Sequence, residues 1–277
     1  MESLKDKTVL ITGATDGLGK LVAQHAASAG ATLILHGRNK EKGRQVTDEI
    51  KLLTGNQNIF YYNADFFSLQ AVKDFSEEVL ANHSALNILI NNAAIGGGPK
   101  GSNQRELSKD GYELRFAVNY LSHFLLTKKL LPLLARSAPA RIINVASIGQ
   151  SPLQFDDIHL ENKYDSYDAY AKSKLAQIIF GFELAEMLKE KDIIVNSLHP
   201  ATLMDTNMVH DFFGKVGSTV EEGAKVVEYV AFSDETKDVT GAYFNQMNQA
   251  KANLQAYDTE ARKKLWELSE KLVERFI

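Results

Sequence analysis

The chain has 277 residues, a formal net charge of −4 and no cysteine. Hydrophobic residues make up 44% and charged residues 24%, an ordinary globular composition that excludes general disorder. The lack of cysteine excludes a disulfide framework and thiolate chemistry, and the slightly acidic balance argues against nucleic acid as a partner. The sequence contains no apolar run long enough for a membrane span and no signal peptide, so we expect a cytoplasmic protein.

Short β-branched runs alternate along the chain with longer amphipathic stretches. The strand-like runs are continuously apolar at their centres, which is typical of strands buried on both faces. This alternation predicts one α/β domain over residues 1–277, a doubly wound Rossmann domain with a seven-stranded, mostly parallel sheet and helices on both faces. The predicted strands are Thr8–Thr12, Thr32–His36, Asn58–Tyr62, Asn87–Asn91, Arg141–Ala146, Ile193–Leu198 and Ala242–Phe244. The predicted helices are Leu18–Ala29, Lys40–Leu53, Leu69–Asn82, Lys109–Ala135, Tyr167–Lys189, Val220–Phe232 and Asp258–Phe276.

Three irregular segments each follow a predicted strand: Gly96–Asn103, Gly149–Ser166 and Ala201–Ser218. They should lie at the carboxyl edge of the sheet, where open α/β sheets bind ligands. The third segment carries the apolar residues Met204, Met208, Val209, Phe212 and Phe213, which predict a lid over an apolar substrate at about 201–218. A cover for the cofactor or a subunit contact is the alternative.

The last predicted helix, at about 258–276, has an apolar stripe formed by Leu265, Leu268, Leu272 and Phe276. We expect this stripe to pack against the protein's own domain or against a second subunit. A helix at a membrane surface is the alternative, which its acidic residues disfavour.

A glycine-rich turn, TGATDGLG, follows the first predicted strand. A strand, a glycine loop and a helix start in this order present backbone N–H groups and a helix dipole to a pyrophosphate. A Cβ atom would keep the phosphate away from the backbone, and a simple tight turn is the alternative. We expect the cofactor to contact Thr12, Gly13, Thr15, Asp16, Gly17, Leu18 and Gly19.

The end of the second predicted strand, in LILHGRNK, indicates which dinucleotide is bound. A carboxylate there would bind the ribose hydroxyls of NAD, whereas an arginine accommodates the 2′-phosphate of NADP. The stretch from His36 to Arg38 has no carboxylate, and the Arg38 guanidinium suits a phosphate. We predict NADP(H) over NAD(H), with a solvated arginine at a helix start as the alternative.

The segment YDSYDAYAKSK has three tyrosines, of which only Tyr170 is followed by a lysine four residues later, at Lys174. Residues with this spacing share a helix face. A phenol titrates near about 10, and an ammonium about 4 Å away supplies roughly the 4 kcal/mol needed to lower its pKa by about three units. The pair is therefore a candidate acid/base, although an isolated pair of this kind is usually a surface pair.

Together these motifs resemble the short-chain dehydrogenase/reductase family, in the family's order and from about Lys5 to the C-terminus. The glycine turn is similar to the family's cofactor loop, and NNAA at 91–94 is similar to its NNAG motif, with Ala94 in place of glycine. Asn119, Ser147 and the Tyr170–Lys174 pair match the family's catalytic residues. Within the family, the chain resembles the retinol dehydrogenase-like and WW-domain oxidoreductase-like branch, in DGYELRFAVNYLSHFLLT and YAKSKLA. The sequence shows neither a WW domain nor a membrane anchor, which argues against retinoid chemistry at a membrane.

The resemblance implies a role for each matched residue. Tyr170 donates or accepts the proton, and Lys174 lowers the pKa of Tyr170 and holds the nicotinamide ribose. Ser147 stabilises the substrate oxygen, and Asn119 helps to hold a water that links Lys174 to solvent. Taken alone, Asn119 could make a local hydrogen bond and Ser147 could be a turn residue. Further cofactor contacts are expected from Asp65 near the adenine, from Asn92 along the path to the nicotinamide, and from Thr202 or Thr206.

These expectations combine into an NADP(H)-dependent oxidoreductase that interconverts a carbonyl and a primary or secondary alcohol. The substrate is expected to be a medium-sized, largely apolar carbonyl or secondary alcohol, although Lys100 and Arg105 leave an acidic group on the substrate open. A redox sensor that binds the dinucleotide without turnover is the main alternative, and epimerisation or ring reduction is a further one. We expect no metal, because the seven histidines lack a ligand-like cluster, and we expect His123 and His199 to be core residues. The resemblance also implies a homodimer or homotetramer through the helices at 109–135 and 167–189.

Overall fold

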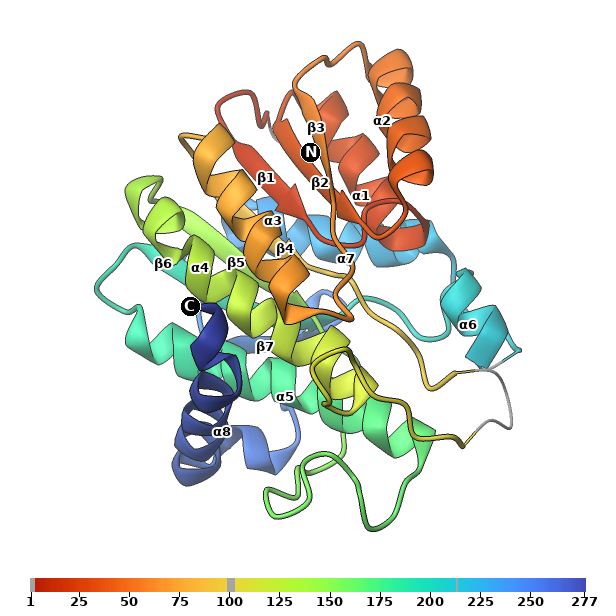
Figure 1. Cartoon of the computed structure of the whole chain (residues 1–277). Coiled ribbons are helices and arrows are strands. Elements are labelled where there is room, and N and C mark those ends of the chain that lie inside the picture. Colours follow the sequence, from red (N-terminus) through yellow and green to blue (C-terminus); the bar gives the residue numbers. More distant parts are fainter. Residues whose placement is uncertain (1–2, 99–102, 213) are drawn as a thin grey trace.

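The computed structural model describes residues 3–98, 103–212 and 214–277, and its strands form one sheet (Figure 1). The order across the sheet is β3-β2-β1-β4-β5-β6-β7-β8. Neighbouring strands are parallel from β3 to β7, and β8 is antiparallel to β7. The strands are β1 (Thr8–Ile11), β2 (Thr32–Gly37), β3 (Ile59–Asn63), β4 (Ile88–Asn91), β5 (Ala140–Val145), β6 (Ile193–His199), β7 (Ala242–Asn245) and β8 (Asn248–Ala250).

This order confirms the doubly wound α/β fold, with its topological switch point between β1 and β4. The predicted number of seven strands is wrong by one. The missed strand, β8, has three exposed residues and pairs with β7 through a tight reversal. A short polar strand of this kind carries no apolar pattern that a sequence reading could detect.

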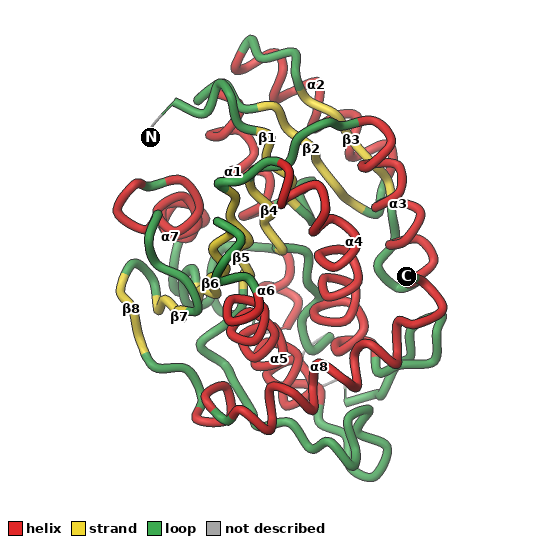
Figure 2. Tube along the Cα trace, turned by 90° about the vertical axis from the view of Figure 1, so that its left-hand side faces the viewer, coloured by secondary structure: helices red, strands yellow, loops and turns green. Residues whose placement is uncertain are grey.

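Helices cover both faces of the sheet (Figures 1 and 2). One face packs against α1 (Gly17–Ser28), α2 (Lys40–Thr54) and α7 (Val220–Phe232), and the other against α3 (Leu69–Asn82), α4 (Ser122–Arg136) and α5 (Ser166–Met187). Successive strand residues enter opposite cores: in β1, Leu10 joins the α3–α5 core, whereas Val9 and Ile11 join the other. Burial on both faces explains the continuously apolar strand sequences.

The helix predicted over Lys109–Ala135 begins later than expected. Leu107 pairs with Glu113 in an isolated bridge, and Gly111 between them has a φ of +87°. A π-helical turn, Phe116–Leu121, then leads into α4. The prediction of a helix start at Lys109 is therefore wrong, because a backbone reversal precedes the helix.

The predicted lid segment is more ordered than an irregular loop. It contains the short helix α6 (Asn207–Phe212), and Met204 bridges to Ser218 at its base. The prediction of an irregular segment is wrong for these residues. Of the other residues singled out from the sequence, Lys100 and Phe213 lie outside the described residues.

The C-terminal helix α8 (Thr259–Val273) packs against α5 and α4 and is followed by a 3-10 turn, Glu274–Phe276 (Figure 2). The Trp266 ring lies 5.1 Å from that of Phe124 on α4 and 6.0 Å from that of Phe180 on α5, centroid to centroid. Leu265 is buried beside them. The predicted packing of this helix on its own domain is confirmed. Among the described residues, no helix combines the length and apolar character needed to cross a membrane.

Candidate active site

A cavity of about 1000 Å³ opens at the carboxyl edge of the sheet. Most of the predicted site residues line it, although they come from the glycine turn, from four strand ends, and from α5 and the lid. The residues brought together are Gly13, Thr15, Asp16, Gly17, Leu18, Gly19, Arg38, Asp65, Asn92, Ser147, Tyr170, Lys174, Thr202 and Thr206. Two predicted residues, Thr12 and Asn119, are fully buried behind the cavity and do not line it.

The glycine turn leaves space at the start of α1. Gly13 has a φ of +66°, and a Cβ there would lie 2.8 Å from Ala93 Cα. A Cβ on Gly19 would lie 2.3 Å from the carbonyl oxygen of Gly13 and 2.6 Å from Asn92 Nδ2. Asp16 caps α1 by accepting a hydrogen bond from the Gly17 N–H. This cradle fits a dinucleotide pyrophosphate, because its backbone can approach the ligand closely at a helix N-terminus.

A buried hydrogen-bond chain supports the cradle from behind. Thr12 Oγ1 accepts from the backbone N–H groups of Asn92 and Ala93. His123 Nδ1 lies 2.9 Å from the carbonyl oxygen of Asn119, so it carries the proton, and Nε2 then accepts from Thr12 Oγ1 at 3.0 Å. Burial lowers the pKa of His123 to about 3. His123 is thus a neutral core residue, as predicted, and it joins the cradle to the Asn119 turn.

The Asn119 side chain holds the loop after β4 and the catalytic helix together. It accepts from the Ile95 N–H at 2.8 Å and donates to the Ile95 carbonyl at 3.0 Å and to Ser173 Oγ at 2.9 Å. Ser173 Oγ in turn donates to the Tyr170 carbonyl. Asn119 therefore reaches the site through α5 and not by facing the cavity.

Arg38 lies at the cavity wall where β2 ends, as expected for a residue that meets the adenosine end of a dinucleotide. Its guanidinium carbon lies 5.9 Å from the centre of the Phe67 ring. Lys42, which the sequence reading missed, also lines the cavity, and its ammonium contacts Asp16 Oδ2 at 2.6 Å. The sequence feature that could have indicated Lys42 is its position in the first turn of the helix that follows Arg38. Asp65, which follows β3 and also lines the cavity, accepts from the Phe67 N–H.

Ser147 and Tyr170 meet through their hydroxyl groups. Burial raises the pKa of Tyr170, and its hydrogen bond with Ser147 offsets part of this increase. Ser147 Oγ also accepts from the Gly149 N–H at 3.0 Å. The phenol is therefore protonated at neutral pH, and it lies beside a hydroxyl that the backbone holds in place.

Lys174 is 2% exposed, and burial lowers its pKa to about 7. Its Nζ donates to the Val145 carbonyl and to Gln177 Oε1, both at 2.9 Å, and lies 5.9 Å from the centre of the Tyr170 ring. The expected depression of the pKa of Tyr170 by Lys174 is wrong for this arrangement. The ammonium is directed at other acceptors, and burial is the largest cause of the pKa shift at both groups.

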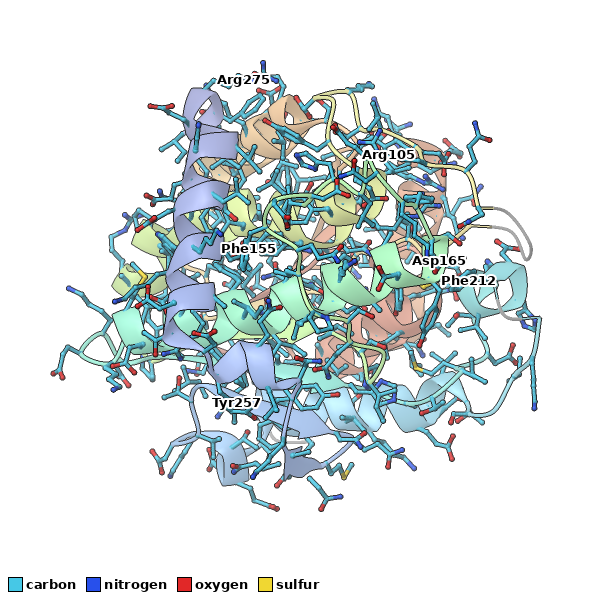
Figure 3. The ribbon with its side chains drawn as sticks, turned by 90° about the horizontal axis from the view of Figure 1, so that it is seen from below. Arg105, Phe155, Asp165, Phe212, Tyr257 and Arg275 are labelled. Atoms are coloured by element: carbon cyan, nitrogen blue, oxygen red, sulfur yellow. The ribbon has the colours of Figure 1, made fainter. Side chains whose placement is uncertain are left out.

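The lid closes the side of the cavity next to Tyr170. The Phe212 ring lies 6.4 Å from the Tyr170 ring and 6.2 Å from the Tyr167 ring, and it is nearly parallel to the latter. A Cβ on Gly97 would lie 2.2 Å from Phe212 Cζ, so this ring rests on the glycine backbone. Figure 3 shows Phe212 near the N-terminal end of α5, which Asp165 caps and where Tyr167 contacts the Phe212 ring. Tyr167 was not singled out from the sequence, although it lies one turn before Tyr170.

The base of the lid is held by polar contacts with the cradle. Asn207 Nδ2 donates to Asp16 Oδ2 at 2.7 Å, and Thr206 Cγ2 would lie 3.1 Å from a Cβ on Gly17. Thr202 Oγ1 is instead 3.0 Å from His199 Nε2, and burial lowers the pKa of His199 to about 4. Within the described ranges, no group of three or more His, Asp or Glu side chains is arranged to hold a metal ion.

Comparison with known proteins identifies the family. A model of the short chain dehydrogenase family matches residues 7–217. Retinol dehydrogenase 13 from Mus musculus is 34% identical over 98% of this chain and 85% of its own length. Retinol dehydrogenase 14 from Homo sapiens is 34% identical over 96% of this chain and 86% of its own length.

Solved structures agree with this relationship. The crystal structure of an uncharacterised protein from Mycobacterium paratuberculosis superposes with a TM-score of 0.81 at 27% identity, covering 99% of this chain and 96% of the other. A short chain dehydrogenase from Shigella flexneri, complexed with NADP, superposes with a TM-score of 0.72 at 26% identity, covering 89% and 99%. The chain belongs to the short-chain dehydrogenase family, in which it is retinol dehydrogenase-like, and it is an NAD(P)-dependent oxidoreductase.

Proposed function

We propose that this protein is an NADP(H)-dependent oxidoreductase that interconverts a carbonyl group and an alcohol, with Tyr170 as the acid/base. The observation that carries the proposal is that Ser147 and Tyr170 line the same cavity as the glycine cradle. A proton donor and a hydroxyl that binds an oxygen atom are thereby fixed beside a dinucleotide site. When bound, the nicotinamide supplies or accepts the hydride.

The chain's own residues would handle the proton and the developing charge. Ser147 Oγ accepts from the Gly149 N–H, which leaves its own proton for an oxygen in the cavity. The raised pKa of Tyr170 keeps the phenol protonated, and this suits proton donation to a carbonyl oxygen. Lys174 Nζ lies 5.9 Å from the centre of the Tyr170 ring, and its remaining N–H donor would hold the nicotinamide ribose. Asn119 would act by holding the turn of α5 that carries Tyr170.

The cofactor preference for NADP(H) is supported by the charge at the adenosine end of the cavity. Arg38 and Lys42 both line it, and β2 ends without a carboxylate. A guanidinium and an ammonium on one wall favour a ligand that carries an additional phosphate. The contact between Thr206 and Gly17 also favours Thr206 over Thr202 as the residue beside the pyrophosphate.

The substrate is proposed to be a largely apolar carbonyl or alcohol, because its side of the cavity is walled by Ile148, Tyr167, Met208 and Phe212. The related proteins named retinol dehydrogenases make retinal a sensible member of a test panel. The cytoplasmic location stays a prediction. A homodimer or homotetramer also stays a prediction, but α8 lies over α5 and α4, so an interface on that side would have to include α8.

The function is tested by following NADPH oxidation with a panel of aliphatic, aromatic and polyunsaturated aldehydes and ketones. Tyr170→Phe should lower turnover by about 100- to 10,000-fold while NADPH binding, followed by fluorescence titration, persists. Tyr167→Phe is the matched control, because it removes a neighbouring hydroxyl that takes no part in proton transfer. Undiminished turnover in Tyr170→Phe would sink the acid/base assignment, and tight NADPH binding without turnover of any compound would favour the redox sensor.

A further inference from the structure

Gln177 contacts the catalytic lysine from the next turn of α5. Its side chain is 1% exposed, and Oε1 accepts a hydrogen bond from Lys174 Nζ at 2.9 Å. An ammonium has donors and no acceptor, so the amide must present its oxygen to Lys174 and its nitrogen elsewhere. Among the described residues, Gln177 Nε2 finds no hydrogen-bond partner. A buried, unpaired amide N–H destabilises a fold, so the contact with Lys174 is made at a structural cost.

The contact limits where the lysine can point. Of the three N–H donors on the ammonium, one goes to the Val145 carbonyl at the end of β5 and one to Gln177. A single donor remains, and Lys174 lines the same cavity as Tyr170. Without Gln177, the long side chain of Lys174 would have one fixed contact in place of two and would be free to turn about it.

We propose that Gln177 is a positioning residue for Lys174: its amide oxygen stabilises the charged form of the lysine and directs the one remaining donor toward the catalytic cavity. The proposal rests on the proposed function only for the role of Lys174. The interaction itself can be tested in protein without cofactor or substrate.

The charges around Lys174 explain why a neutral amide matters. Tyr170 on its own helix and His123 on α4 are the titratable groups that face it, and burial keeps both in their neutral forms near pH 7. Burial is also the one cause that shifts the pKa of Lys174, so no carboxylate in the described part of the chain compensates its charge. Gln177 and Val145 are therefore the groups that hold the cation.

The test is a pH titration of the Lys174 Cε signal by NMR in cofactor-free protein labelled with ¹³C-lysine, with the signal assigned from Lys174→Met. Gln177→Glu keeps the shape and adds a negative charge, so it should raise the titration midpoint by more than about one pH unit. Gln177→Met removes the acceptor at similar volume and should lower the midpoint by about one pH unit. Gln177→Asn, which keeps the amide but is too short to reach, should behave like Gln177→Met.

The chain offers a matched control. Gln154 Oε1 accepts from Lys172 Nζ at 3.4 Å, and Lys172 is a partly buried lysine of α5 that is also paired with Asp168. Gln154→Glu thus makes the same exchange beside a different lysine and should leave Lys174 unchanged. In turnover assays, the high-pH limb of the plot of rate against pH should move in the same direction as the NMR titration midpoint of Lys174 in each variant. An unchanged midpoint in the Gln177 variants that fold, or a loss of thermal stability without any shift, would overturn the proposal. Absence of turnover in the parent protein would count against the proposed function and leave the NMR result valid.

Discussion

The cradle and the lid line one cavity and touch at the base of the lid, but they are built in different ways. The cradle is backbone held by buried hydrogen bonds, such as those of Thr12 and His123. The lid is a six-residue helix, whose polar contacts, Asp16 with Asn207 and Asp205 with His210, are exposed to solvent. A backbone held in place by buried hydrogen bonds suits the cofactor, which is the same in every turnover. The side chains of a short surface helix can instead be replaced or move to fit a particular substrate.

The largest effect is expected where a side chain is forced into the cradle. In Gly19→Ala the new Cβ would lie 2.3 Å from the Gly13 carbonyl oxygen, which is backbone and cannot move aside freely. We expect dinucleotide affinity to fall by more than about 100-fold, equivalent to roughly 3 kcal/mol, because the turn must distort. Fluorescence titration with NADPH measures this. Gly217→Ala, at the base of the lid, meets its nearest atom at 3.3 Å and serves as the control; an equal loss there would erase the contrast between cradle and lid.

Acid should destabilise the fold through two buried histidines that support the cradle: His36, whose Nδ1 accepts from the Gly13 N–H at 3.3 Å, and His123, which contacts Thr12. Burial lowers the pKa of His36 to about 4 and that of His123 to about 3, against 6.5 for the free side chain. Their stabilising contribution is therefore complete above pH 6.5 and is lost as the pH falls toward these folded-state values. Each shift corresponds to about 3 kcal/mol or more of unfolding free energy.

This pH dependence can be measured by urea denaturation at several pH values between 7 and 4. His36→Gln should reduce the slope of unfolding free energy against pH. A slope in His36→Gln equal to that of the parent would show that His36 does not carry the acid sensitivity.

A smaller and more selective effect is expected at the adenosine end of the cavity. Arg38→Ala should weaken NADPH binding by about 10- to 100-fold and leave NADH binding nearly unchanged, because it removes a charged donor for a phosphate. Competitive titrations with the two nucleotides give the ratio directly. The control is Arg44→Ala, which removes an arginine of α2 that does not line the cavity. Equal weakening of both nucleotides would contradict a role for Arg38 in selecting NADP(H).

The smallest effect is expected in the lid. Phe212→Ala should raise KM for bulky apolar carbonyls by a few fold, because an apolar ring next to Tyr170 is removed while the cradle is untouched. Gly97→Ala should act in the same direction, since its Cβ would displace the ring. Steady-state kinetics with one small and one bulky carbonyl measure both variants. A large loss with the small carbonyl would show that Phe212 supports the chemistry and not the selection of substrate.

The sequence predicted the fold well where burial is continuous and poorly where it is not. Strands such as Ile88–Asn91 and Ile193–His199 are covered on both faces, so their apolar runs were unambiguous. The missed elements are β8, which is exposed and polar, and α6, which has less than two helical turns. The late start of the helix after Gly111 depends on a left-handed backbone position and a long-range bridge, which no local pattern encodes.

For the site, the sequence identified the groups but not how they are arranged. Tyr170, Lys174 and Ser147 were found from their spacing, and the cavity brings them together. The predicted direct effect of Lys174 on the pKa of Tyr170 failed, because spacing alone says nothing of the acceptors that compete for the ammonium. Gln177 was missed for the same reason, since a glutamine in a helix gives no sign of what it touches once buried.

The position of α8 has a consequence for how the chain is made. Trp266 and Leu265 complete the hydrophobic cover over α4 and α5, yet they follow both helices in the sequence. During synthesis, α4 and α5 therefore leave the ribosome first and display the rings of Phe124 and Phe180 without their natural partner, a surface that promotes self-association. Docking of α8 is thus the folding step that seals this side of the molecule.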